Sequence, residues 1–290
     1  MSVYKLTYRA YTGKVTPLWK RIYVLARYGF AEAWSSKITV CLFTLALLPA
    51  VVSLIVIYLA NNPLARLLVF KSSNHGLPID ARFFLTVLEM QSWFALAITS
   101  WIAPRLISFD LADNALPILL SHPISRTGYV LGKLSALLAF LSMVTWVPCL
   151  LLFAYQSYSS PVPWAMSNLG LAGGLLVGEA IWIAFLAILG LALSSWVKWR
   201  VVATGTIFAA VFVPAGVGAI VSAILRTKWG SLLNLPMMMS VLWQRLLGAP
   251  ELFRSADSLP TVAILLMLAL ACLLCVAMLN MRIRAREVIR

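Results

Sequence analysis

The residues best suited to chemistry or recognition form a polar segment, residues 110–133, between two long apolar runs. Its charged and helix-breaking residues are Asp110, Asp113, Pro123, Arg126 and Lys133. Two acids at the start of a short amphipathic stretch favour a helix, because carboxylates stabilise a helix N-terminus, and a proline then ends it. This arrangement is expected of a loop that presents a short helix to a soluble protein.

Catalytic and metal-binding motifs are missing from the sequence. Gly128–Lys133 is not a phosphate-binding loop, because three residues instead of four separate its glycines. With His75 and His122 as the only histidines, no H-E-x-x-H metal helix can form, and no nucleophile elbow of the G-x-S-x-G kind occurs. Cys272 and Cys275 have the spacing of a redox or metal pair, but apolar packing is the favoured interpretation. We therefore expect no catalytic residue, metal site or cofactor site in this chain.

The elements that must position the polar segment are membrane spans. The chain of 290 residues is 62% hydrophobic and 11% charged, whereas a soluble domain carries about 25% charge. Runs of about 20 apolar residues can cross roughly 30 Å of hydrocarbon. Six such runs lie near residues 38–60, 83–104, 134–155, 168–195, 201–224 and 260–280. They predict an all-α polytopic membrane protein with six transmembrane helices.

The basic residues predict the orientation of these helices. Of the 23 Lys and Arg residues, sixteen fall on the side that holds both termini and the polar segment, and seven fall on the other side. The positive-inside rule therefore places both termini in the cytoplasm, for which we expect a bacterial inner membrane. The net charge of +14 then reflects topology and attraction to anionic lipid. No nucleic-acid partner is expected, because no basic cluster is interleaved with exposed aromatic residues.

Residues 1–37 are too polar to span a membrane. Within them, apolar and basic positions alternate at helical spacing over residues 18–30, which predicts an amphipathic helix lying in the membrane interface. Its candidate interface residues are Trp19, Lys20, Arg21 and Arg27. A simple anchor and a partner-docking role are both compatible with this pattern.

The loop over residues 226–259 is too apolar for a solvated loop and too broken for a spanning helix. It predicts a re-entrant hairpin of two short helices in the outer leaflet, with Trp229 and Trp243 near the lipid headgroups. Irregular backbone at that depth must be surrounded by protein. The hairpin should therefore pack on other spans or line a cavity.

Two carboxylates lie inside predicted spans, at Glu179 and Glu89. An ionisable group in hydrocarbon is costly and normally faces protein or water. Glu179 is therefore a candidate for a substrate path, a proton-linked step or a gate. The alternative is an interhelical hydrogen bond from the protonated acid, which is favoured more strongly for Glu89.

Small residues and a proline mark the fourth and fifth spans. Gly170, Gly174 and Gly178 recur every four residues and predict close approach of another helix, within this chain or from a second copy, with the first favoured. Pro214 lies near the centre of the fifth span, in Pro214-Ala-Gly-Val-Gly218. It predicts a break in the helix that serves either as a packed kink or as a gating hinge.

The order of these elements, together with Leu119-Leu-Ser-His-Pro123-Ile-Ser-Arg126 and Gly132-Lys133, resembles the permeases of ABC-2 type ABC transporters. The resemblance covers the chain in topology and is concentrated in residues 110–133 at the level of sequence. It implies a connecting-helix region at 1–37 and a transmembrane domain at 38–290. Within that domain it implies a coupling loop at 105–133 and an outer hairpin at 226–259.

The resemblance also implies partners. Such permeases act as dimers, with a second permease copy or paralogue, and they are driven by a separate ATP-binding subunit that carries ATP and Mg²⁺. Coupling to that ATPase would involve Asp110, Asp113, Leu119, Pro123, Arg126 and Lys133. The expected function is then ATP-driven export across the cytoplasmic membrane, without catalysis by this chain.

Alternatives to export remain at the level of the sequence. A mechanical transmission subunit that acts on a periplasmic partner would have the same pattern. A proton-coupled secondary transporter could use Glu179 but would be expected to contain inverted repeats, which the sequence does not show convincingly. A membrane-bound transferase or lipid enzyme would need a cluster of polar residues at one interface.

Overall fold

The computed structural model describes residues 16–62, 79–112, 125–160, 164–249 and 259–284. Within these ranges the chain is helical, with no strand. Six helical segments are long and apolar enough to cross a membrane, which confirms an all-α, multi-pass membrane protein. They are α2 (Lys37–Asn61), α4 (Ala81–Ala112), α6 with α7 (Arg126–Val144 and Trp146–Ser159), α9 (Leu169–Trp196), α10 (Arg200–Leu225) and α12 (Thr261–Arg284).

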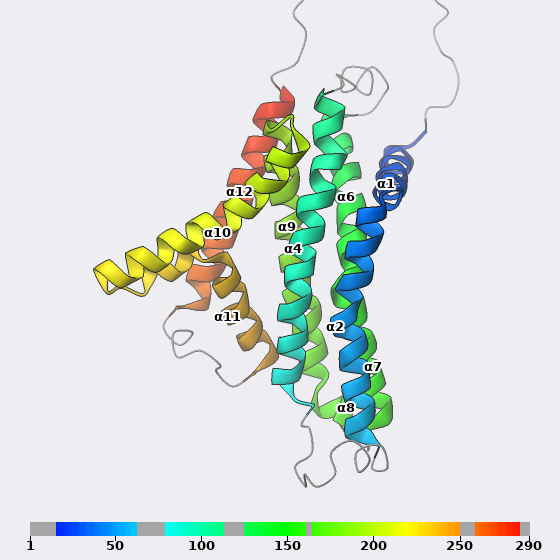
Figure 1. The fold of residues 1–290 in the computed structure, drawn as a ribbon, viewed down its shortest axis with the longest axis vertical. Coiled ribbons are helices and arrows are strands. Elements are labelled where there is room, and N and C mark those ends of the chain that lie inside the picture. Colours follow the sequence, from blue (N-terminus) through cyan, green and yellow to red (C-terminus); the bar gives the residue numbers. More distant parts are fainter. Residues whose placement is uncertain (1–15, 63–78, 113–124, 161–163, 250–258, 285–290) are drawn as a thin grey trace, which may run out of the picture.

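Four shorter elements complete the described fold. Helix α1 (Leu18–Trp34) precedes the first span, and α8 (Trp164–Ser167) precedes α9. A 3-10 turn, η1 (Trp229–Leu233), and helix α11 (Leu235–Leu247) lie between α10 and α12. Figure 1 shows α1 at the end of the bundle where α2 and α6 begin, steeply inclined to α2.

The spans divide into an inner and an outer set. The buried share is 61% in α4, 56% in α6–α7 and 67% in α9, but 17% in α2, 17% in α10 and 22% in α12. The outer helices therefore present apolar side chains outward, as lipid-facing helices do. Figure 1 shows α10 diverging from the long axis of the bundle, while α4 and α9 run side by side at its centre.

The predicted end of the second span is wrong. The second span was expected to end at Pro104, but α4 continues through this proline to Ala112. The apolar pattern continues beyond the proline, because Leu106 and Ile107 are buried in the core. As a result Asp110 belongs to the last turn of α4, and not to the first turn of a separate short helix.

The third and fifth spans also differ from expectation. The third begins at Arg126, eight residues before the predicted start, and breaks at Thr145, whose φ of −103° and ψ of −96° are not helical. Conversely, α10 continues as one helix through Pro214, so the proline does not interrupt it, and the kink or hinge stays a prediction. A hydrogen bond ties α10 to α4: the Thr204 hydroxyl of α10 donates to the Ser100 carbonyl oxygen of α4 at 2.9 Å.

Candidate functional site

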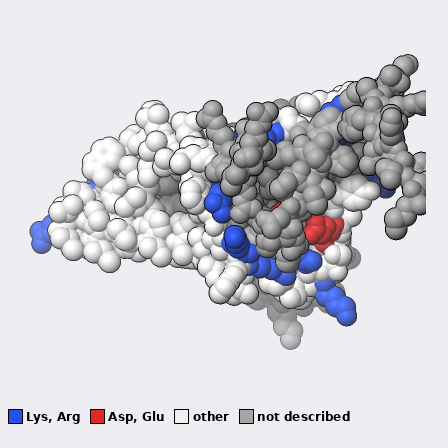
Figure 2. Space-filling view, turned by 90° about the horizontal axis from the view of Figure 1, so that it is seen from above, with Lys and Arg blue, Asp and Glu red and all other residues white. Residues whose placement is uncertain are grey.

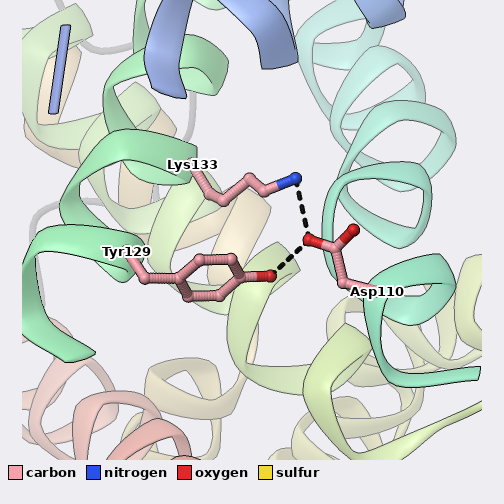
Figure 3. A network of polar contacts seen from close by, with 3 residues as sticks. All are labelled: Asp110, Tyr129 and Lys133. Carbon is pink, nitrogen blue, oxygen red and sulfur yellow. Dashed lines mark hydrogen bonds and ion pairs between the residues drawn. The ribbon is translucent and has the colours of Figure 1, made fainter. Parts of the chain in front are cut away.

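The two flanks of the polar segment meet in a network of three polar side chains (Figure 3). Lys133 Nζ of α6 lies 2.9 Å from Asp110 Oδ2 of α4. The Tyr129 hydroxyl donates a hydrogen bond of 2.6 Å to the same oxygen. Tyr129 and Lys133 are buried, so their polar atoms need partners inside the protein, and Asp110 supplies both.

The start of α6 brings Tyr129 and Lys133 onto one face. Ser125 caps the helix, since its hydroxyl accepts a hydrogen bond of 3.1 Å from the Gly128 amide. Tyr129 and Lys133 are four residues apart and therefore project from the same side of α6. Tyr129 was not predicted as a candidate, although its four-residue spacing from Lys133 places it beside that lysine on a helix.

Helix α1 is packed against the same part of the bundle. Leu25 lies over Gly132, where an added Cβ would come within 2.6 Å of the leucine Cδ2. Gly29 similarly faces Leu106 of α4 and Ala136 of α6. Because glycine allows such close approach, α1 is seated directly on the helices that carry the polar network.

The other residues of the predicted coupling set are only partly described. Arg126 is half-buried at the first position of α6. Asp113, Leu119 and Pro123 lie outside the described residues. On α1, Trp19, Lys20 and Arg27 are exposed, whereas Arg21 is half-buried.

Basic side chains gather at this end of the bundle. Figure 2 looks onto this end and shows Lys and Arg beside an acidic patch. Arg282 of α12 donates a hydrogen bond of 3.2 Å to the Ser195 carbonyl near the C-terminus of α9. The guanidinium carbon of Arg200 lies 3.9 Å from the ring centroid of Trp101. Cations are favourable near a helix C-terminus. Basic side chains at this end therefore pack on other helices as well as facing outward.

The buried carboxyl of Glu179 lies in the middle of α9. Its side chain has no exposed surface, and the Thr145 hydroxyl beside its carboxyl group already donates a hydrogen bond to the Leu141 carbonyl oxygen. Nearby in the bundle, the Cys149 thiol of α7 donates a hydrogen bond of 2.8 Å to Gln91 Oε1 of α4. Gln91 and Cys149 were not predicted as candidates, because their approach depends on how α4 and α7 pack.

Glu89 and Trp243 both line one cavity. Glu89 Oε1 accepts a hydrogen bond of 2.5 Å from the Ser240 hydroxyl of α11. Trp243 was expected near the lipid headgroups, but it is 2% exposed and packs edge-on against Trp182, with ring centroids 5.9 Å apart. The hairpin residue Trp229, by contrast, is 61% exposed. As expected, the segment between α10 and α12 packs on other spans and lines a cavity.

The glycine stripe of α9 receives α11. An added Cβ on Gly174 would lie 2.5 Å from the Leu246 carbonyl oxygen, and one on Gly178 would lie 2.6 Å from the Trp243 ring. Gly170 has open space at the corresponding position. Two of the three glycines therefore serve packing within the chain.

Comparison with known proteins adds no further evidence. No protein-family model matches the chain, and a search of curated proteins finds no match.

Proposed function

We propose that this chain is the permease subunit of an ATP-driven ABC exporter and that separate ATPase subunits bind at the Asp110–Lys133 end. The proposal rests on the resemblance of residues 110–133 to the ABC-2 permeases and on six membrane-spanning helices. As expected for a permease, the chain itself would carry no ATP, Mg²⁺ or catalytic group. Movement of its membrane-spanning helices would carry the substrate across the membrane.

The observation that carries this proposal is the ion pair between Asp110 and Lys133. These residues flank the segment 113–124, so the pair ties its two ends together. A displacement imposed on the segment would then pass to α4 and α6 together, and α1 would move with them because Leu25 and Gly29 are seated on the same helices. Coupling to an ATPase requires that a movement of the docking segment be transmitted to the spans in this way.

The topology of the proposed exporter follows from the charge distribution. The basic end would face the cytoplasm of a bacterial cell, with α1 lying in the membrane interface as the connecting helix. The segment from η1 to α11 would be the re-entrant outer hairpin. The packing of α11 on α9 and of η1 on α10 supports this assignment, because backbone that is not α-helical is tolerated at membrane depth only against protein. A second permease copy or paralogue would complete the exporter.

The decisive experiment is co-purification with an ATP-binding subunit encoded beside this gene. Charge reversal at the proposed docking end, in Arg27→Glu and Arg126→Glu, should reduce the recovered ATPase by at least about fivefold. The matched control is Arg82→Glu, an exposed basic residue at the opposite end of the bundle. Equal recovery with all three variants, or no association with the wild type, would contradict the proposal.

Glu179 favours a second candidate, a proton-coupled secondary transporter. A fully buried carboxyl group in the fourth span is the kind of group that such transporters use. The two functions differ in their energy source. Transport by the chain alone in vesicles with a proton gradient and no nucleotide would favour this candidate.

A further inference from the structure

The cavity at Glu89 has the dimensions and walls of a small-molecule site. Its volume is about 310 Å³, and it lies between α4, α9 and α11. Binding pockets for small molecules span about 300–1,000 Å³ and combine apolar walls with a few polar groups. Here the polar groups are Glu89, Ser92 and Ser240, and the other lining residues are apolar or aromatic.

An ionised Glu89 would give the cavity a negative charge without a basic partner among the described residues. Its Oε1 accepts the Ser240 hydrogen bond, and within the described ranges no lysine or arginine pairs with it. It lies about 12 Å along α4 from Ala81, at 1.5 Å per residue, and therefore inside the span. A carboxylate at that depth is costly unless a cation offsets its charge.

The remaining walls are suited to an organic cation. Trp93, Trp182 and Trp243 all line the cavity. Indole faces attract cations electrostatically, most strongly when the cation has lost water, and the thioether of Met237 is a polarisable apolar contact. A metal ion or hydrated inorganic cation would find too few oxygen ligands here, because Glu89 is the only carboxylate in the lining.

The aromatic wall is held in place before any ligand binds. Trp243 is fixed against Gly178 and packs edge-on against Trp182. At another wall Trp93 is half exposed and stacks on Phe212 of α10, with ring planes 5° apart. Phe212 therefore supports the Trp93 ring from α10, the helix that diverges from the bundle (Figure 1).

We propose that this cavity binds an organic monocation, an amine or quaternary ammonium with an apolar body, as the substrate class of the chain. As a statement about substrate, the inference rests on the transport function proposed above. The ammonium group would lie between Glu89 and the indole faces, and the apolar body would lie against Trp243 and Met237.

Binding can be measured by equilibrium dialysis of the purified full-length chain in lipid nanodiscs, with benzyltrimethylammonium as the probe. Its neutral carbon isostere, neopentylbenzene, has the same shape without the charge. We expect saturable binding of the cation with a Kd below about 1 mM. The isostere should not compete.

Three variants localise the binding. Glu89→Gln keeps the hydrogen bond to Ser240 but removes the charge and should weaken binding at least about tenfold. Met237→Trp fills the cavity, leaves Glu89 intact and should also abolish binding. Glu32→Gln, which removes an exposed carboxylate on α1, should bind as the wild type does.

The proposal is overturned if the wild type does not bind the probe, if neopentylbenzene competes equally, or if Glu89→Gln and Met237→Trp both bind normally. Should Glu89→Gln fail to yield folded protein, Met237→Trp decides alone. Because this assay contains no ATPase, its outcome is independent of the co-purification test. Binding without ATPase association would uphold the cavity and reject the exporter, whereas association without binding would do the reverse.

Discussion

Lys133 of α6 and Asp110 of α4 form an ion pair with an Nζ–Oδ2 separation of 2.9 Å, and the lysine side chain is only 7% exposed. Tyr129 donates to the same carboxylate oxygen, so one acid satisfies two buried groups from a neighbouring helix. Removing either charge would leave its partner desolvated without compensation. The pair is therefore a structural tie between two spans and joins the two ends of the polar segment.

Loss of the acid should destabilise the protein more than loss of the tyrosine hydroxyl. We expect Asp110→Asn to lower the free energy of unfolding by about 2–4 kcal/mol, because Lys133 stays buried without a counter-ion. Tyr129→Phe should cost about 1 kcal/mol, as for one hydrogen bond. Unfolding in mixed detergent micelles with increasing SDS measures both changes.

A double-mutant cycle provides the control for this prediction. Lys133→Met removes the charge that Asp110 neutralises, so the double variant Asp110→Asn/Lys133→Met should lose less stability than the two single changes added together. Additive losses would mean that the two residues stabilise the protein independently.

The basic end and the η1 end of the chain should be accessible from opposite sides of the membrane. In a cysteine-free background, Lys228→Cys should react with a membrane-impermeant maleimide on intact bacterial cells. Ser125→Cys should react only after permeabilisation, because it lies at the basic end. Both positions are exposed, so accessibility and not burial decides the result. Labelling of Ser125→Cys in intact cells would reverse the proposed topology.

The spans themselves could be predicted from sequence because each must match the thickness of the hydrocarbon. For α2, α9 and α10 the observed ends lie within one or two residues of the predicted ones. The errors fall where packing overrides a local signal. Pro104 reads as a helix end, but buried Leu106 and Ile107 hold α4 helical beyond it.

The candidate sites were less predictable than the spans. Asp110 and Lys133 could be singled out as charges in an apolar chain, but their pairing depends on α4 continuing past Pro104. The side chains around Glu89 come from α4, α9 and α11, which are distant in sequence. Trp243 looked like an interfacial aromatic, because nothing in its own segment indicates that Gly178 provides space for its ring.

Alanine substitutions at Gly174 and Gly170 of α9 should affect stability differently, because only Gly174 is in close contact with α11. Gly174→Ala places a methyl group 2.5 Å from a backbone carbonyl oxygen, which cannot move aside as a flexible side chain can. We expect a loss of about 1–3 kcal/mol from overpacking and displacement of α11. Gly170→Ala, one turn away with open space, is the matched control and should leave stability unchanged or slightly raised. SDS-induced unfolding compares the two, and equal losses would contradict the packing role of α11.

Glu179 should be replaceable by an apolar residue without loss of stability. Its carboxyl group is fully buried, and the neighbouring Thr145 hydroxyl donates to the Leu141 carbonyl oxygen instead of to the carboxyl group. Removing a buried unsatisfied polar group relieves a desolvation penalty of about 1–3 kcal/mol, so we expect Glu179→Leu to be at least as stable as the wild type in SDS-induced unfolding. Glu179→Gln keeps a polar group and should gain less. A marked loss of stability in Glu179→Leu would mean that the carboxyl is satisfied in the membrane by a bound water or ion. If instead Glu179→Leu is stable but loses ATP-dependent transport, the carboxyl group takes part in transport, and this role explains why the protein keeps a destabilising buried acid.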